Sequence, residues 1–227
     1  MNLEKKQIVL ERIYQTYDHF TKGLDVACKK YCTNCCTRNV TMTTLEGYMV
    51  AKFLKSRGKT DLYANIKKAF DKKRFLPEIT INTMADLYLQ GKDTHVDESH
   101  ARWGECPLLI SGECSIYQVR PFGCRCFVSK IKCKEDGCAE VSPFVFTVNS
   151  LFLQYIEHVD QDGCFGNLTD ILLFMQNEEN RKLFENGIIT CKNAWMIPNK
   201  PAKVLVIPPE HKSRIEPILK VLQNSAV

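Results

Sequence analysis

Four cysteines lie within nine residues near the start of this chain, in the segment Cys28-Lys-Lys-Tyr-Cys32-Thr-Asn-Cys35-Cys36. The segment has neither helical nor strand periodicity, so we expect a loop. Thiolates are ligands for soft metals such as zinc, copper(I) and the iron of iron–sulfur clusters. The segment therefore predicts a loop that is folded around a metal.

A second group of cysteines follows later in the chain, at Cys106, Cys114, Cys124 and Cys126. Glycine and proline recur throughout residues 106–138, which predicts turns and short extended pieces. We interpret the two groups as halves of one soft-metal site that folding brings together. A substitution such as Cys35→Ser is then expected to cost metal and solubility together.

The compartment of the protein decides whether its cysteines are ligands or disulfide partners. Ten of the twelve cysteines lie between residues 28 and 138. The first residues lack the uninterrupted apolar stretch and the small-residue cleavage site of a secretory signal, and no apolar run approaches the length of a membrane span. We therefore expect a cytoplasmic protein, in which clustered cysteines bind metal and disulfides are disfavoured.

The charge of the chain argues against nucleic acid as a partner. It carries 31 basic and 26 acidic residues, and its formal net charge is +5. This surplus is small and scattered, so we expect neither a nucleic-acid partner nor a membrane partner. No Ser-His-Asp set, paired catalytic carboxylates or phosphate-binding loop is evident, so the sequence indicates no general acid or base.

Most of the chain outside the cysteine groups has apolar residues at helical spacing. Residues 3–24 predict an amphipathic helix, and helical pattern also covers residues 83–90 and 178–185 and the segment after Pro209. Residues 203–207 are the best candidate for a strand. Signals for further helix starts occur at Thr43-Thr-Leu-Glu46, Asp61, Ser142-Pro143 and Asn167.

These patterns predict a mainly α protein with little β-structure, in which helices wrap an irregular cysteine-rich metal-binding centre. At 44% apolar content, 227 residues can bury a substantial core. We expect a single domain over residues 1–227. Residues 24–140 would form its cysteine-cluster metal-binding core, and residues 141–227 a helical C-terminal part packed on that core.

The spacing of the cysteines favours a cluster over one structural zinc. Zinc sites commonly use two C-x2-C pairs, and here only Cys32 and Cys35 have that spacing. The adjacent pair Cys35-Cys36 suits a single tetrahedral ion poorly, because neighbouring side chains diverge. We therefore expect an iron–sulfur cluster or two separate metals. Either Arg120 or Arg125 would stabilise an anionic cluster electrostatically if it lay nearby.

The spacing from Cys28 to Cys32 to Cys35 also has the C-x3-C-x2-C form found in radical S-adenosylmethionine enzymes. Those enzymes place the motif after the first strand of an α/β barrel. In this chain a predicted helix precedes the motif, no succession of strands and helices follows it, and Cys36 adds a fourth thiol. We therefore disfavour this interpretation.

Taken together, residues 24–140 resemble the zinc- or iron-chelating cysteine-cluster proteins of the YkgJ type, which carry a CxxCxxCC block. The first block of this chain differs in having three residues, not two, between Cys28 and Cys32. The matching segments are the first four cysteines, Val40-Thr-Met-Thr43-Thr-Leu-Glu46, Cys106-Pro-Leu-Leu and Cys114-Ser-Ile-Tyr-Gln-Val-Arg120-Pro-Phe-Gly-Cys124-Arg125.

The resemblance implies metal or iron–sulfur binding in the cytoplasm. It also implies an eighth cysteine ligand downstream, for which Cys138 is the first candidate and Cys126 and Cys133 are the alternatives. Cys164 and Cys191 lie outside the match, so we expect plain buried thiols there and a nearly silent Cys191→Ser substitution. The predicted ligand set is Cys28, Cys32, Cys35, Cys36, Cys106, Cys114, Cys124 and Cys138.

We thus expect a metalloprotein that binds an iron–sulfur cluster of the 4Fe–4S type for redox chemistry or substrate activation. One alternative is an interaction module that Zn²⁺ stabilises. The other is an enzyme similar to a protein lysine N-methylase, because the superfamily includes flagellin lysine N-methylases. That activity would require a protein partner or substrate, although no glycine-rich methyl-donor signature is evident.

Overall fold

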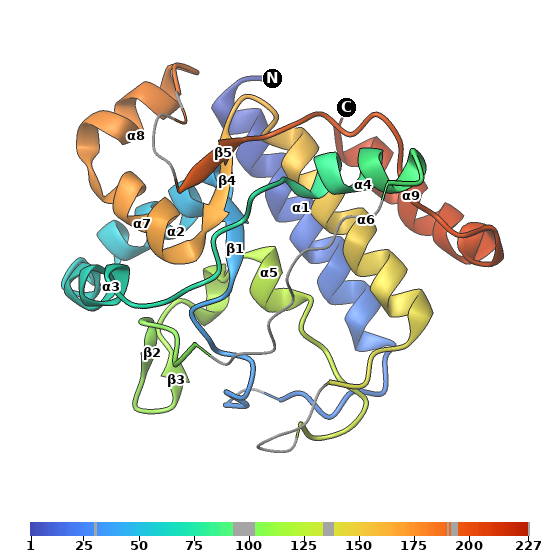
Figure 1. The fold of residues 1–227 in the computed structure, drawn as a ribbon, viewed down its shortest axis with the longest axis horizontal. Coiled ribbons are helices and arrows are strands. Elements are labelled where there is room, and N and C mark those ends of the chain that lie inside the picture. Colours follow the sequence, from blue (N-terminus) through green and yellow to red (C-terminus); the bar gives the residue numbers. More distant parts are fainter. Residues whose placement is uncertain (30, 93–102, 134–138, 190, 192–194, 227) are drawn as a thin grey trace.

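The structure is a computed structural model of the chain and describes residues 1–29, 31–92, 103–133, 139–189, 191 and 195–226 (Figure 1). Nine α-helices and five short strands occur in these residues, which confirms the predicted mainly α class. None of the helices in these ranges is both long enough and apolar enough to cross a membrane.

The helices vary widely in length, whereas every strand is short. The helices are α1 (Leu3–Lys22), α2 (Thr44–Ser56), α3 (Leu62–Phe70), α4 (Ile81–Leu89), α5 (Phe122–Arg125), α6 (Pro143–Val159), α7 (Leu168–Gln176), α8 (Glu178–Glu185) and α9 (Lys212–Ala226), with 3-10 turns η1 (Tyr117–Val119) and η2 (Pro209–His211). The strands are β1 (Thr41–Thr43), β2 (Leu109–Ile110), β3 (Glu113–Cys114), β4 (Cys164–Asn167) and β5 (Met196–Pro198).

Local capping chemistry starts several of these helices where the sequence predicts. At α2 the Thr43 hydroxyl accepts from the Glu46 amide while the Glu46 carboxylate accepts from the Thr43 amide, so the capping box is confirmed. The side chains of Ser142 and Asn167 cap α6 and α7 by accepting from the amides of Val145 and Thr169. At Asp61 the predicted cap is wrong. Its backbone is already helical, whereas a capping residue is extended, and its side chain makes no capping bond.

A small antiparallel sheet in the order β1-β4-β5 lies between two groups of helices. Met42 pairs with Gly166, and Phe165 pairs with Ile197. Figure 1 shows α2, α3, α7 and α8 on one side of this sheet and α1, α6 and α9 on the other. β1 follows the first cysteine group directly, so the sheet anchors that group to the helical body.

The strand predicted at residues 203–207 is wrong. This segment runs beside α6, and the side chain of buried Gln154 takes up its backbone groups. Gln154 donates to the Val204 carbonyl at 3.0 Å and accepts from the Val206 amide at 3.2 Å. A side chain thus satisfies the groups that a neighbouring strand would otherwise pair with. The strand at this end of the chain is instead β5.

The core has two apolar clusters, and both reach the second cysteine group. In the first, the rings of Phe122 and Phe152 stack at 5.5 Å, and Tyr17 packs edge-on to Phe122 at 4.6 Å. Phe122 is the first residue of α5, the short helix that carries Cys124. The second cluster involves α2, α3, α7 and β4, and the partly buried Cys106, Cys114 and Cys124 pack against it.

Candidate metal centre

The first cysteine group lies in an irregular loop between α1 and β1. Two consecutive turns shape it: the amide of Cys32 donates to the Lys29 carbonyl at 3.0 Å, and the amide of Cys36 donates to the Thr33 carbonyl at 2.8 Å. Tyr31 has a left-handed backbone, with φ of 76°. These two turns and the left-handed residue between them give the loop its irregular path.

Backbone pairing joins this loop to the second cysteine group. The Cys36 carbonyl accepts from the Cys106 amide at 2.9 Å, and Thr37 forms an antiparallel bridge with Glu105. The two cysteine groups therefore meet in space, although 69 residues lie between Cys36 and Cys106 in the sequence.

A hairpin positions the next two thiols. Leu109 of β2 pairs with Cys114 of β3, and the Leu109 amide also donates to the Cys106 carbonyl at 3.0 Å. Ser111 and Gly112 make the turn with φ of 51° and 78°. Cys106 and Cys114 consequently lie together at the open end of the hairpin.

Cys124 is presented by α5, and Gly123 permits the position of that helix. A Cβ at Gly123 would lie 2.6 Å from the carbonyl oxygen of Thr41 in β1. Only glycine therefore allows α5 to approach β1 this closely. Because β1 also continues the first cysteine loop, this contact brings Cys124 to the same place as the other thiols.

Seven of the predicted ligands line one cavity of about 320 Å³. Cys138 lies outside the described residues. Within the described part of the chain, no three His, Cys, Asp or Glu side chains are grouped closely enough to hold a metal ion as they stand. Metal binding would thus require the thiols to close further on a common point. The seven are Cys28, Cys32, Cys35, Cys36, Cys106, Cys114 and Cys124.

The thiols differ in their protonation chemistry from free cysteine. Burial raises the pKa of Cys106 to about 11. Burial and then the neighbouring Cys106 and Cys114 raise the pKa of Cys124 well above its usual value. The hydrogen bond with Cys36, followed by burial, raises the pKa of Cys35. These thiols therefore hold their protons at neutral pH, and a metal would have to displace those protons in order to bind.

The two arginines considered from the sequence have different positions. Arg125 is buried and donates to the carbonyls of Arg120 and Gln118 at 3.0 and 3.1 Å, and it pairs with Asp18 of α1 at 3.1 Å. It therefore fastens the segment between Cys114 and Cys124 to α1.

Arg120 is one of four cationic residues that line the cavity, together with Arg125, Lys22 and Lys29. Its guanidinium carbon lies 4.0 Å from the centre of the Tyr117 ring. Burial raises the pKa of Cys114, and the positive charge of Arg120 partly offsets this effect. The same charge also partly offsets the raised pKa of Cys35. Arg120 thus favours negative charge on the thiols around it.

Glu46 has a second function that the sequence pattern does not reveal. Besides capping α2, its buried carboxylate accepts from the Tyr14 hydroxyl at 2.7 Å and from the Phe122 amide at 2.7 Å. It therefore joins α1, α2 and the first residue of α5. The capping box indicates only the local bond to Thr43, because the other two partners are distant in sequence.

The two alternative eighth ligands lie in different surroundings. The sulfur of Cys126 is 3.5 Å from the Gly123 carbonyl oxygen, and its side chain packs against the first core cluster instead of lining the cavity. The carbonyl of Cys133 accepts from the Asn34 side chain at 2.8 Å. Cys133 is therefore adjacent to the first cysteine loop, and Cys126 belongs to the core.

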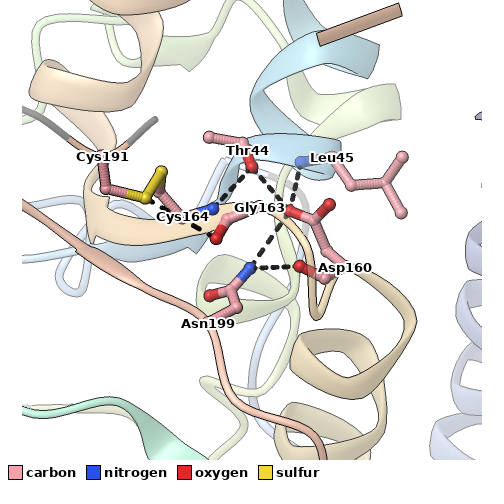
Figure 2. The surroundings of a disulfide bond; sticks show 7 residues. All are labelled: Thr44, Leu45, Asp160, Gly163, Cys164, Cys191 and Asn199. Carbon is pink, nitrogen blue, oxygen red and sulfur yellow. Dashed lines mark hydrogen bonds between the residues drawn. A yellow bond between two sulfur atoms is a disulfide. The ribbon is translucent and has the colours of Figure 1, made fainter. Parts of the chain in front are cut away.

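The expectation of plain buried thiols at Cys164 and Cys191 is wrong. The two residues form a disulfide, with Cα atoms 6.0 Å apart (Figure 2). Cys164 lies at the start of β4, and Cys191 lies between α8 and β5. Cysteines 27 residues apart carry no signal of pairing in one sequence, because only the return of the chain to β4 brings them together.

A buried carboxylate fixes α2 next to this disulfide (Figure 2). Asp160 accepts from the Thr44 hydroxyl at 2.7 Å, from the Leu45 amide at 2.9 Å and from the Asn199 side chain at 3.2 Å. Burial raises the pKa of Asp160 to about 7, although Lys6 lies 4.0 Å away. The sequence indicates only a polar turn here, and the role of Asp160 is structural.

No family model, curated protein or solved structure matches this chain. The resemblance to the CxxCxxCC proteins therefore stays a prediction, and the arrangement of the thiols carries the functional argument.

Proposed function

We propose that this protein is a cytoplasmic metalloprotein whose clustered cysteines bind an iron–sulfur cluster, for redox chemistry or for activation of a substrate. The observation that carries this proposal is the cavity into which two separate segments bring seven cysteines together with Arg120. We propose the seven as ligands, and Cys138 as a further one.

The chemistry of the lining fits an iron–sulfur cluster. Cysteine thiolates are the usual ligands of such clusters, and a cluster with four thiolates is anionic. Arg120 supplies a positive charge beside Cys114 and Cys35, and this charge favours an anionic group there. When bound, the cluster would supply either a one-electron carrier or an iron that polarises a substrate.

The protein groups around the cavity would position and shield the cluster. Glu46 and Gly123 hold α5 in place, and therefore hold Cys124. The second core cluster excludes water from the side of Cys106 and Cys124. Cys32, in contrast, is exposed, which supports access of a redox partner or substrate.

A zinc-stabilised interaction module is the second candidate, and the rim of the cavity favours it. Tyr31, Tyr117 and Phe127 line the cavity and are 60%, 38% and 49% exposed. Exposed aromatic side chains gathered at one place are typical of a surface that contacts another protein. In this case the metal would only organise the loops that carry these rings.

The lysine N-methylase-like activity rests on the resemblance alone. It requires a methyl donor, so we expect S-adenosylmethionine to raise the melting temperature if this activity exists. An unchanged melting temperature at saturating S-adenosylmethionine would argue against a donor site.

The state of the cysteines supports a reducing compartment such as the cytoplasm. Nine cysteines of the described residues are free, whereas two form a disulfide. Free thiols in this number fit a compartment where glutathione and thioredoxin keep them reduced, whereas the Cys164–Cys191 disulfide is unusual in such a compartment.

Anaerobic purification of the full chain, with analysis of metal and acid-labile sulfide, tests the proposal. We expect iron and sulfide in equal amounts, at about four of each per bound cluster, and a broad absorption band that fades in air. Zinc without sulfide would support the interaction module instead. A protein that binds neither metal after reconstitution would refute both candidates.

A further inference from the structure

We infer that the disulfide between Cys164 and Cys191 is a site of reversible thiol–disulfide exchange, and that the molecule which reduces it is a protein dithiol that attacks the sulfur of Cys191. The bond joins the start of β4 to the connection between α8 and β5. Neither cysteine belongs to the proposed ligand set. The inference therefore goes beyond the proposed function and does not depend on metal binding.

The other cysteines of the chain favour exchange over a permanent cross-link. Nine of them are free in the described residues, against the one pair that is bonded. Nine free thiols fit a compartment where dithiol proteins keep cysteines reduced, and disulfides that form in such compartments are usually transient, catalytic or redox-sensing. A dithiol reductant is thus the partner that this cross-link would meet.

The two sulfur atoms differ in accessibility. Cys164 is 0% exposed and is a member of the second core cluster. Cys191 is only partly buried and packs against that cluster. The rate of thiol–disulfide exchange depends on which sulfur an attacking thiolate can reach. The attack is therefore directed to Cys191, and Cys164 is the leaving group.

The exchange proceeds in two balanced steps. A thiolate of the reductant attacks the sulfur of Cys191, the bond between the two protein sulfurs breaks, and its electron pair goes to Cys164, which takes up a proton. The second thiolate of the reductant then attacks the reductant's own sulfur in the mixed disulfide and releases Cys191, which is also protonated. Two electrons and two protons pass to the protein, and the dithiol becomes a disulfide.

The strands next to the disulfide hold their places without it. Phe165 of β4 pairs with Ile197 of β5. Asn199 reinforces this pairing, because its amide donates to the Gly163 carbonyl at 3.0 Å and its side chain donates to the Asp160 carbonyl at 2.7 Å (Figure 2). These bonds hold β5 on β4 in either redox state, so reduction does not require the protein to unfold.

Both thiols of the reduced form have favourable surroundings. Cys164 lies among apolar side chains, where a free cysteine packs as a small hydrophobic residue. The sulfur of Cys191 is 3.7 Å from the Gly163 carbonyl oxygen, which can accept the hydrogen bond of the new thiol (Figure 2). The reduced and the oxidised chain are therefore both folded, as a reversible exchange requires.

Reduction removes the covalent tether between Cys191 and β4. Ile189 lies two residues before Cys191 and packs against both core clusters. The cross-link restricts how far this segment can move from the core. We therefore expect the packing of Ile189 to loosen on reduction, while β4 remains in the sheet.

The redox equilibrium of the folded chain tests the inference. The full chain would be equilibrated anaerobically in buffers from mainly oxidised to mainly reduced glutathione, its thiols alkylated, and the peptides that contain Cys164 and Cys191 identified by mass spectrometry. We expect the bonded fraction to fall by about tenfold or more across these buffers, while circular dichroism stays that of a folded protein. A disulfide that persists in the most reducing buffer, or that opens only when the chain unfolds, would overturn the inference.

Trapping of the mixed disulfide identifies the attacked sulfur. The probe is a protein of the thioredoxin class whose second active-site cysteine is replaced by serine, so that it stays attached to the sulfur it attacks. We expect the adduct on Cys191 of the wild type and no adduct with Cys191→Ser, or with Cys191→Ala if the serine variant does not fold. Cys126→Ser is the matched control, since it removes a free thiol and should form the wild-type adduct. An adduct on Cys164 would contradict the assigned direction of attack.

Amide hydrogen exchange measures the effect on the segment before Cys191. The peptide that contains Ile189 and Cys191 should exchange about tenfold faster in the reduced chain, whereas the peptide that contains Phe165 should exchange equally in both states. Equal exchange of the first peptide in the two states would show that the disulfide does not hold this segment, and the loosening on reduction would be refuted.

Discussion

The carboxylate of Glu46 accepts a hydrogen bond from the backbone amide of Phe122 at 2.7 Å, in the interior of the protein. The same carboxylate caps α2 through Thr43 and accepts from Tyr14. One buried side chain therefore connects the helix that follows the first cysteine group to the helix that carries Cys124. The two halves of the candidate centre share this support.

Removal of this carboxylate should destabilise the protein and weaken its metal binding. Glu46→Ala removes part of a capping box and leaves the Phe122 amide buried without its acceptor, at a combined cost of about 2–4 kcal/mol. The measurement is urea unfolding together with metal content per folded chain. Glu11→Ala on the exposed side of α1 is the control, and it should behave as wild type. An unchanged unfolding free energy for Glu46→Ala would contradict this role.

Gly123→Ala should displace α5 and lower the metal content. The added Cβ would meet the Thr41 carbonyl oxygen at 2.6 Å, and a backbone atom in a strand cannot move aside easily. We expect a lower melting temperature and a clear loss of bound metal. Gly23→Ala provides the matched control, because its Cβ would make only an ordinary contact at 3.6 Å. Equal metal content in the two variants would show that the close approach is unimportant.

Cys191→Ser should be destabilising, in contrast to the expectation from the sequence. The disulfide with Cys164 spans 27 residues, and loss of such a cross-link costs about 3 kcal/mol. Urea unfolding with and without a reducing agent measures this effect. The reducing agent should lower the stability of the wild type but not that of Cys191→Ser. If the two proteins unfold alike under oxidising conditions, the disulfide does not contribute.

Asp160 should make the free energy of unfolding fall as the pH rises, which is the opposite of the usual effect of a paired carboxylate. Burial raises its pKa to about 7, so between about pH 4 and pH 7 the folded state binds more protons than the unfolded state. The contribution of Asp160 is therefore fully present below the unfolded pKa and is lost as pH rises through 7. Asp160→Asn should flatten this decline in the unfolding free energy, whereas Asp162→Asn at an exposed carboxylate should not.

Arg120→Gln should shift the reduction potential of a bound cluster to a more negative value. Its positive charge lines the cavity and favours the more negative, reduced state. The midpoint potential measured by redox titration tests this, with Arg120→Lys expected to restore most of the wild-type value. The control is Arg57→Gln, because Arg57 follows α2 and does not line the cavity. Identical potentials for Arg120→Gln and wild type would place the cluster away from Arg120.

The sequence by itself determined the features that depend on neighbours along the chain. Helical periodicity located α1, and capping residues located the starts of α2, α6 and α7, because the chemistry of a first turn involves only the next few residues. The same local reasoning predicted an irregular loop at the first cysteine group. It failed at residues 203–207, where the distant Gln154 satisfies the backbone.

Only the tertiary structure decided which distant groups meet. The disulfide between Cys164 and Cys191, the bond from Phe122 to Glu46 and the location of Cys133 beside Asn34 all join segments that are remote in sequence. Composition can show that such thiols and carboxylates exist. Their partners are set by how α5, β1 and β4 pack around a common core. Burial of apolar surface is not directional, so it brings together segments whose pairing no local pattern encodes.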